Sequence, residues 1–298
     1  MTTPLTDFSN GLAAAVEKGG ASTILVDARK RYPASGIAYA GDLVLTADHV
    51  VTREDDVKIL LPNGMAAGAT VAGRDPGSDL ALLRLVEPAL TPAKTSDAVK
   101  VGQLVLALGR PSGAGMQASW GIVTAISGPA RTFRGGLLDE YIQTETTPYP
   151  GFSGGPLINT EGEVLGLNTS GLTRGSSLTI PVKVAWRIAD ALAKYGTVKR
   201  GYLGVRTQPV DVPDAARQAL KREQSHGLLI LWLEEAGPAD KAGLLVGDIL
   251  VAVSGQAVGD ADDLFSALNS DTVGKSVAVE VLRGGRPEAI AVTVGERK

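Results

Sequence analysis

Short apolar runs, broken by Gly, Pro and Asp, fill roughly the first two thirds of the chain. One group extends from STILVD to LALLRLV, and a second extends from QLVLALG to SLTIPV. The runs are rich in β-branched residues and are bounded by turn residues, which is typical of β-strands. Each group holds about six such runs, and short strands at this spacing favour closed barrels. The pattern therefore predicts a mainly β fold with two antiparallel barrels.

Two helices are expected at the edges of this strand-rich region. The segment GLAAAVEKGG, from Gly11 onward, is typical of a short helix that stops at the glycine pair. In VKVAWRIADALAKYG the apolar positions recur at helical spacing, and Gly196 follows as a C-cap. The polar and basic TVKRG then indicates a linker. We expect one domain over residues 1–198, including the N-terminal helix, and a second domain over residues 199–298.

The composition argues against several kinds of site and partner. The 298 residues contain no cysteine, which rules out disulfides and a thiol nucleophile. His49 and His226 are the only histidines, too few for a zinc site of the usual nitrogen and sulfur ligands. A formal charge of -3 gives no reason to expect a nucleic-acid surface. We therefore expect no metal, no cofactor and no nucleic-acid partner, and a solvent-exposed position without a task for His226.

The expected location depends on the start of the native chain. The opening MTTPLTDFSN lacks a basic stretch followed by an apolar core, so no signal peptide is visible. No uncharged apolar run is long enough to cross a bilayer. A cytoplasmic location is expected if Met1 is the native start, and an extracytoplasmic one if an export signal has been removed.

The strongest chemical signal is GFSGGPL, which begins at Gly151. Flanking glycines let the backbone turn sharply around Ser153 and approach a substrate carbonyl without side-chain obstruction. Backbone N–H groups in such a turn can converge on a developing oxyanion. Taken alone, the segment fits a glycine-rich hairpin loop equally well.

Two upstream segments change that balance. TADHVV places His49 at the end of an apolar strand, and DPGSDLALL places Asp79 where a turn enters a strand. Singly, a lone histidine is more often without a task, and an aspartate in a turn is ordinary. The order His, Asp, Ser excludes the α/β-hydrolase plan, in which Ser153 would come first. It matches the chymotrypsin-like plan, with His and Asp on the first barrel and Ser on the second.

TADHVV, DPGSDLALL and GFSGGPL, followed by VLGLNTSG and LTIPV, resemble the HtrA family of chymotrypsin-like serine proteases over nearly the whole chain. The resemblance implies an oligomeric, ATP-independent endopeptidase of protein quality control, which cuts unfolded or misfolded proteins through an acyl-enzyme. It implies His49 as general base, Asp79 as the residue that orients it, and Ser153 as nucleophile. Gly151 and Ser153 would supply the oxyanion N–H groups. The family usually has Asn before this serine, where this chain has Phe152, a bulky side chain that must pack somewhere.

Two other functions remain as alternatives. A chaperone or scaffold could use the C-terminal domain and keep a silent protease domain, and Phe152 is the feature that favours this reading. The complete set of His49, Asp79 and Ser153 favours the active protease instead. An esterase is disfavoured by the order of the three residues.

In the chymotrypsin-like plan, the pocket for the residue before the cut is built from two stretches, here residues 147–150 and 168–171, with Leu178 nearby in a third wall. Neither stretch holds an acid, so a buried Lys or Arg would lack a partner. We therefore expect cleavage after small or medium apolar residues. The candidate substrate-binding residues are Thr147, Tyr149, Asn168, Thr169, Ser170 and Leu178.

The C-terminal domain resembles a PDZ domain, which implies binding of peptide C-termini by strand addition. The GYLGV segment carries the candidate peptide-binding residues Tyr202, Leu203, Gly204 and Val205. A helix over residues 262–268 would form the other wall of the groove, although its apolar residues also fit a core position.

Within that helix, a core position is the better interpretation for Phe265. The family resemblance further implies a homotrimer, with Phe8 as a possible N-terminal contact. The stretch from Ala28 to Pro33 is short, so no long loop is expected there to lock trimers into larger cages.

Overall fold

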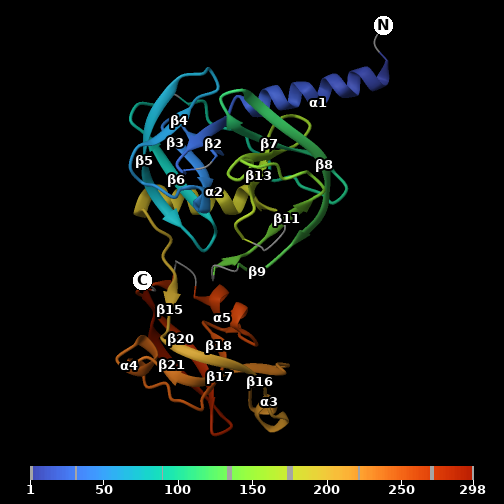
Figure 1. The fold of residues 1–298 in the computed structure, drawn as a ribbon. Helices are drawn as coiled ribbons and strands as arrows, with labels where there is room; N and C mark the ends of the chain where they lie inside the picture. The colour runs from blue at the N-terminus through green and yellow to red at the C-terminus, as the bar shows by residue number, and fades with distance from the viewer. Residues whose placement is uncertain are drawn as a thin grey trace. The chain divides into compact units, whose positions relative to one another are not determined.

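The computed structural model describes residues 3–296 apart from 31, 89, 133–135, 173–176, 221 and 269–271, and only the backbone of Arg131 and Leu137. The chain divides into two compact units, Met1–Val198 and Lys199–Lys298. Among the described residues, the first unit contains two closed barrels and two α-helices, and the second contains an antiparallel sheet and the short helices α3, α4 and α5 (Figure 1). The predicted mainly β fold with two barrels is confirmed.

Six strands close the first barrel in the order β1-β2-β3-β6-β5-β4. Apolar side chains such as Val26, Val44 and Leu83 are fully buried inside it. The strands are β1 (Thr23–Asp27), β2 (Ala34–Ala40), β3 (Leu43–Ala47), β4 (Val57–Leu60), β5 (Ala66–Asp75) and β6 (Leu80–Leu85), with the 3₁₀ turn η1 (Asp48–Val50) after β3.

The second barrel closes in the order β11-β14-β13-β12-β7-β8. Its longest strands, β7 and β8, form a hairpin. The strands are β7 (Leu104–Ser112), β8 (Gly115–Ser127), β11 (Tyr141–Thr144), β12 (Pro156–Ile158), β13 (Val164–Thr169) and β14 (Leu178–Pro181), and β9 (Ala130–Arg131) pairs with β10 (Leu137–Leu138) beside them.

Helix α1 (Pro4–Gly20) is longer than the sequence pattern predicts, although it ends at the expected glycine pair. It begins at Pro4, about two turns before Gly11, because Thr3 is an N-cap. The hydroxyl of Thr3 accepts a hydrogen bond from the N–H of Thr6. Pro4 occupies the first helical position, where its missing N–H costs nothing. The apolar pattern of the middle of the helix does not carry this start signal.

Helix α2 (Val182–Tyr195) connects the two barrels. It packs against β5 and β6 of the first barrel and against β13 and β14 of the second (Figure 1). Its buried residues, among them Val184 and Leu192, join a core that contains Leu82 from one barrel and Leu167 from the other. The expected C-cap is confirmed, because Gly196 has a φ of 72°. No helix in the described part of the chain is long and apolar enough to span a membrane.

The second unit is built on a sheet of order β16-β17-β18-β20-β21, in which β16 is an edge strand. The small β15 pairs with β22, and β19 pairs with β18. The elements are β15 (Gly201–Tyr202), β16 (Val205–Asp211), α3 (Asp214–Leu220), β17 (His226–Leu233), α4 (Pro238–Ala242), β18 (Ile249–Val253), β19 (Gln256–Ala257), α5 (Ala261–Ala267), β20 (Ser276–Arg283), β21 (Arg286–Thr293) and β22 (Gly295–Glu296).

In helix α5, the position of Phe265 differs from the one that the sequence predicts. Leu264 and Leu268 are buried in the core of the second unit, but Phe265, for which a core position was preferred, is only half-buried and lies outside that cluster. The reason is helical spacing: positions 264, 267 and 268 share the face toward the sheet, which turns position 265 to the side. His226, at the start of β17, is exposed as expected.

Candidate active site

His49 and Asp79 are brought together by the pairing of two strands. η1 follows β3, Asp79 directly precedes β6, and the register pairs Ala47 with Leu80. The N–H of His49 donates to Oδ1 of Asp79 at 2.9 Å, and Nδ1 of its ring lies 2.8 Å from Oδ2. This contact directs Nδ1 to the carboxylate and leaves Nε2 as the proton acceptor on the other side of the ring.

The carboxylate of Asp79 is fully buried and has a third partner from the other barrel. The hydroxyl of Thr169, at the end of β13, donates to Oδ2 and accepts from the N–H of Gly171 at 2.9 Å. Thr169 was expected to line the substrate pocket. Its side chain instead holds Asp79, because the alternation of β13 turns this residue toward the first barrel.

The loop that carries Ser153 is fastened to the first barrel by Ser35 on β2. The hydroxyl of Ser35 donates to the carbonyl of Gly151 at 2.7 Å, and its N–H donates to the carbonyl of Ser153 at 3.1 Å. Gly151 and Gly154 have φ values of 89° and 86°, a left-handed backbone that favours glycine. The role of Ser35 could not be predicted from the sequence, since nothing near it in sequence indicates a contact with a loop more than a hundred residues away.

Two backbone N–H donors in the Ser153 loop have no acceptor among the described residues. In the described part of the chain, the N–H groups of Gly151 and Ser153 donate to no protein acceptor. The N–H of Phe152 between them is engaged, donating to the carbonyl of Tyr149 at 3.0 Å. Unengaged donors on both sides of one turn are the arrangement that can stabilise a developing oxyanion.

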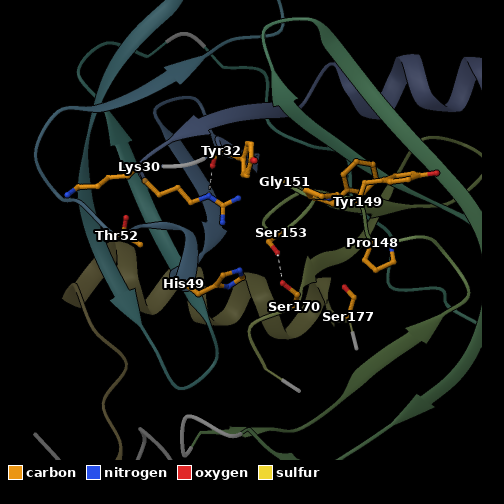
Figure 2. Close-up of a pocket in the computed structure, with 13 residues that line it drawn as sticks. Lys30, Tyr32, His49, Thr52, Pro148, Tyr149, Gly151, Ser153, Ser170 and Ser177 are labelled. Carbon is orange, nitrogen blue, oxygen red and sulfur yellow. Dashed lines mark hydrogen bonds between the residues drawn. The ribbon is translucent and has the colours of Figure 1, made fainter. Parts of the chain in front are cut away.

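The hydroxyl of Ser153 lies between His49 and the Tyr149 segment (Figure 2). Its Oγ is 3.1 Å from Oγ of Ser170, and no hydrogen bond joins it to His49 among the described residues. In sites without substrate, such hydrogen bonds are often long and tighten only when substrate binds. The arrangement could therefore supply a base, an acid that orients it, a nucleophile and oxyanion donors, once substrate binding brings Ser153 to His49.

The side chain of Phe152 packs in the apolar interior of the second barrel and does not obstruct the loop. Its ring is 2% exposed and packs with Val105 and Ile142 inside the second barrel. A Cβ on Gly109 would lie 2.4 Å from this ring, so Gly109 leaves the space that the ring fills. Tyr149 packs edge-on against it at a centroid distance of 5.4 Å. The bulky residue thus anchors the Ser153 loop through apolar packing.

Two hollows adjoin this loop. The larger is a cleft of about 530 Å³ that contains His49 and Ser153 (Figure 2). The smaller, of about 230 Å³, has Phe152 in its wall, and none of the described residues that line it is charged. Its lining residues are Ala107, Thr144, Thr146, Pro148, Phe152, Asn168, Ser177 and Thr179.

Of the other residues predicted to bind substrate, some line the two hollows and some do not. Tyr149 and Ser170 line the cleft, and Asn168 lines the smaller hollow. Leu178 is buried in the main core and lines neither hollow, and neither does Thr147, whose carbonyl accepts from the hydroxyl of Ser119. Side-chain direction depends on strand register, which the sequence pattern does not resolve. Among the described residues, no three metal-ligating side chains cluster.

The GYLGV segment of the second unit also presents open backbone donors. The carbonyls of Leu203 and Gly204 accept from Ala239 and Glu234, each at 2.8 Å. The N–H groups of Leu203 and Gly204 donate to no acceptor in the described part of the chain. Because Gly204 has a φ of 77° and precedes the edge strand β16, these donors lie where an added peptide strand would end.

Two family models match the chain. A trypsin-like peptidase domain matches residues 34–167, and a PDZ domain matches residues 201–294. A probable periplasmic serine endoprotease, DegP-like, of Halomonas elongata is 37% identical over 276 residues, which are 90% of this chain and 57% of the relative. One of the same name from Pseudomonas putida strain W619 is 36% identical over 269 residues, 88% of this chain and 55% of the relative. The chain thus spans about half the length of the curated relatives it matches.

Solved structures match over nearly the full length of the chain. The HtrA-type protease AlgW with a tripeptide has a TM-score of 0.80 and 27% identity, covering 96% of this chain and 97% of that one. The serine endoprotease from Yersinia pestis has a TM-score of 0.79 and 26% identity, covering 96% and 98%.

The anchoring of the loop predicts the behaviour of Phe152→Ala. Without the ring, Gly151 and Ser153 should lose their fixed positions, and the reaction of Ser153 with a fluorophosphonate should slow by about 10²-fold, the scale of losing one oxyanion donor. The melting temperature should fall too, because a Phe→Ala cavity costs about 3–5 kcal/mol.

Ile142→Ala is the matched control, since Ile142 lies in the same apolar cluster but on β11, outside the loop. It should lower the melting temperature and leave the rate with the fluorophosphonate nearly unchanged. Equal rates for the wild type and folded Phe152→Ala would contradict the anchoring role.

Proposed function

The chain belongs to the HtrA family of serine proteases, in which a trypsin-like peptidase domain precedes a PDZ domain, and on that premise we propose that it is an endopeptidase for unfolded or misfolded proteins. The observation that carries the proposal is the buried Asp79 carboxylate, held by Thr169 and directed at Nδ1 of His49, beside a glycine-flanked Ser153. ATP independence and a role in protein quality control belong to the same proposal.

The proposed reaction proceeds through an acyl-enzyme. Oγ of Ser153 attacks the peptide carbonyl while Nε2 of His49 takes its proton, and Asp79 stabilises the resulting imidazolium. The N–H groups of Gly151 and Ser153 stabilise the oxyanion. His49 then protonates the departing amine, and water, activated by the same histidine, releases the acyl group. Each step is a proton or acyl transfer, so the chemistry requires no ATP.

One observation favours a second candidate, a chaperone with a silent protease domain. The hydroxyl of Ser153 is paired with Ser170 instead of His49. Phe152, which suggested the same alternative at the level of sequence, now supports the protease, because its packing keeps the oxyanion donors in place. The two candidates differ in whether substrate moves Ser153 to His49.

The smaller hollow is the proposed pocket for the residue before the cut. Its lining offers no acid to a Lys or Arg, whereas an apolar Val or Leu would gain about 1.5–3 kcal/mol on full burial. Phe152 limits its depth, which favours small and medium side chains over aromatic ones.

The proposed partners and location follow from the family. The curated relatives are named periplasmic, so we propose the extracytoplasmic alternative for this chain. The proposed homotrimer would use α1, on which Leu5 and Phe8 are 76% and 50% exposed. Arg31, within the short stretch from Ala28 to Pro33, lies outside the described residues.

Ser153→Ala tests the proposed reaction. The variant should fold normally, because the side chain is partly exposed and makes a single hydrogen bond to Ser170, and it should no longer degrade unfolded casein. The remaining site would keep at most roughly 10³–10⁴-fold over water, which gel assays do not detect. Degradation by Ser153→Ala at the wild-type rate would refute the assignment, and an inert wild type would support the chaperone.

The peptides in the wild-type casein digest test the pocket. Mass spectrometry should find most cuts after Ala, Val, Leu or similar apolar residues, because the pocket cannot pair a charge. A majority of cuts after Lys or Arg would show that the smaller hollow does not hold this residue.

Peptide binding to the second unit can be measured with the full Ser153→Ala chain, which cannot consume the peptide. A peptide with an apolar free C-terminus should bind, and C-terminal amidation should weaken its affinity by about tenfold or more, since the carboxylate loses charge-assisted bonds to Leu203 and Gly204. Equal affinity of the free and amidated peptides in calorimetry would exclude these N–H groups as the carboxylate receptor.

A further inference from the structure

The cleft around Ser153 has two unlike walls. On one side lie Pro148 and Tyr149, next to the smaller hollow, and on the other lie Lys30 and Tyr32 from the connection between β1 and β2 (Figure 2). Arg29 belongs to the second wall as well. Apart from the catalytic histidine, Arg29 and Lys30 are the only ionisable cations in the described lining, and no Asp or Glu lies among the lining residues.

Arg29 is a half-buried cation without an acid. Its Nε donates to the carbonyl of Tyr32, and its Nη2 donates to the carbonyl of Pro33 at 3.4 Å. Burial lowers the pKa of its guanidinium, and no carboxylate pairs with it in the described part of the chain. Its Nη1 has no protein acceptor among those residues. A cation that loses hydration and gains no counter-charge is costly unless something else supplies the charge.

Three other half-buried arginines are paired with acids. Arg53 binds Asp27 at 2.7 Å, Arg74 binds Asp48 at 2.6 Å, and Arg222 binds Glu280 at 2.8 Å. Arg110 is half-buried and has no ion pair with a described residue either, since its Nε donates to the carbonyl of Thr23 at 3.1 Å. Arg110 does not line the cleft, whereas Arg29 does. Lys30 beside it has no ion pair with any described residue either.

The direction of the substrate decides what meets this wall. If the residue before the cut fills the smaller hollow, the scissile carbonyl lies at Ser153. An extended chain advances about 3.3 Å per residue, so the residues after the cut leave the hollow and pass the wall of the first barrel. That wall is made by Arg29, Lys30 and Tyr32.

We propose that Arg29 and Lys30 form a subsite for an acidic side chain within the first three residues after the cut. The inference rests on the proposed endopeptidase function and extends it to the leaving-group side of the substrate. A carboxylate there would accept hydrogen bonds from the N–H groups of Arg29 that have no described acceptor, and Lys30 would add a second positive charge. The aromatic ring of Tyr32 would shield one side of this pair from water. The chain would therefore prefer substrates with an apolar residue before the cut and an acid shortly after it.

The test uses internally quenched peptides that share one apolar residue before the cut. They differ by Glu, Gln or Lys at the first, second or third position after it. For the wild type, kcat/KM should be about three- to tenfold higher for Glu than for Gln at one of these positions, the size expected of a partly screened ion pair. The Lys peptide should be the poorest, and 0.5 M NaCl should reduce the preference.

Variants assign the preference to the two residues. The ratio of kcat/KM for the Glu and Gln peptides should fall toward one in Arg29→Gln and should fall partway in Lys30→Gln. Lys100→Gln is the matched control, since it removes one exposed cation far along the chain from the cleft lining and should keep the wild-type ratio. If Arg29→Gln does not fold, Lys30→Gln and the salt dependence still decide the question.

The outcomes separate the two proposals. If the wild type cuts none of the peptides, the proposed function fails. If it cuts the Glu and Gln peptides at the same kcat/KM, or if the ratio survives in both Arg29→Gln and Lys30→Gln, the endopeptidase stands and the acidic subsite is wrong.

Discussion

The buried carboxylate of Asp79 requires hydrogen-bond partners, and those partners come from both barrels. His49 supplies its backbone N–H and its ring from the first barrel, and Thr169 supplies a hydroxyl from the second. Removing one partner from a buried charge typically costs about 3–5 kcal/mol, so the relative position of the barrels and the orientation of the histidine depend on the same contacts. Helix α2 reinforces this arrangement from outside, since it packs on both barrels.

The loop that carries Ser153 is also held by both barrels, through hydrogen bonds to one and apolar packing in the other. Ser35 of the first barrel binds two of its carbonyls, and Phe152 fills the apolar interior of the second. With hydrogen bonds on one side and apolar packing on the other, the N–H groups of Gly151 and Ser153 have no acceptor among the described residues. A bulky residue before the nucleophile is therefore compatible with preorganised oxyanion donors, provided that Gly109 leaves room for its ring.

Much of the fold could be predicted from the sequence, because short β-branched runs between turns encode strands locally. The order and the segments of His49, Asp79 and Ser153 predicted one shared site, and the structure places His49 against Asp79 and Ser153 in the same cleft as His49. The direction of individual side chains was not, since a strand residue faces one side or the other according to a register set by distant partners. Thr169 therefore supports Asp79 instead of lining the pocket, and Leu178 lies in the core. The start of α1 at Pro4 was not predicted from the apolar pattern, because it depends on the N-cap at Thr3.

We propose that His49, held by Asp79, activates Ser153 for acyl transfer. Pre-steady-state hydrolysis of a chromogenic peptide ester with an apolar acyl residue tests it directly. We expect a burst of one leaving group per chain, an acyl group on the Ser153 peptide in acid-quenched samples, and loss of both in His49→Ala. A missing burst with steady turnover, an acyl group on another residue, or an undiminished burst in His49→Ala would contradict it.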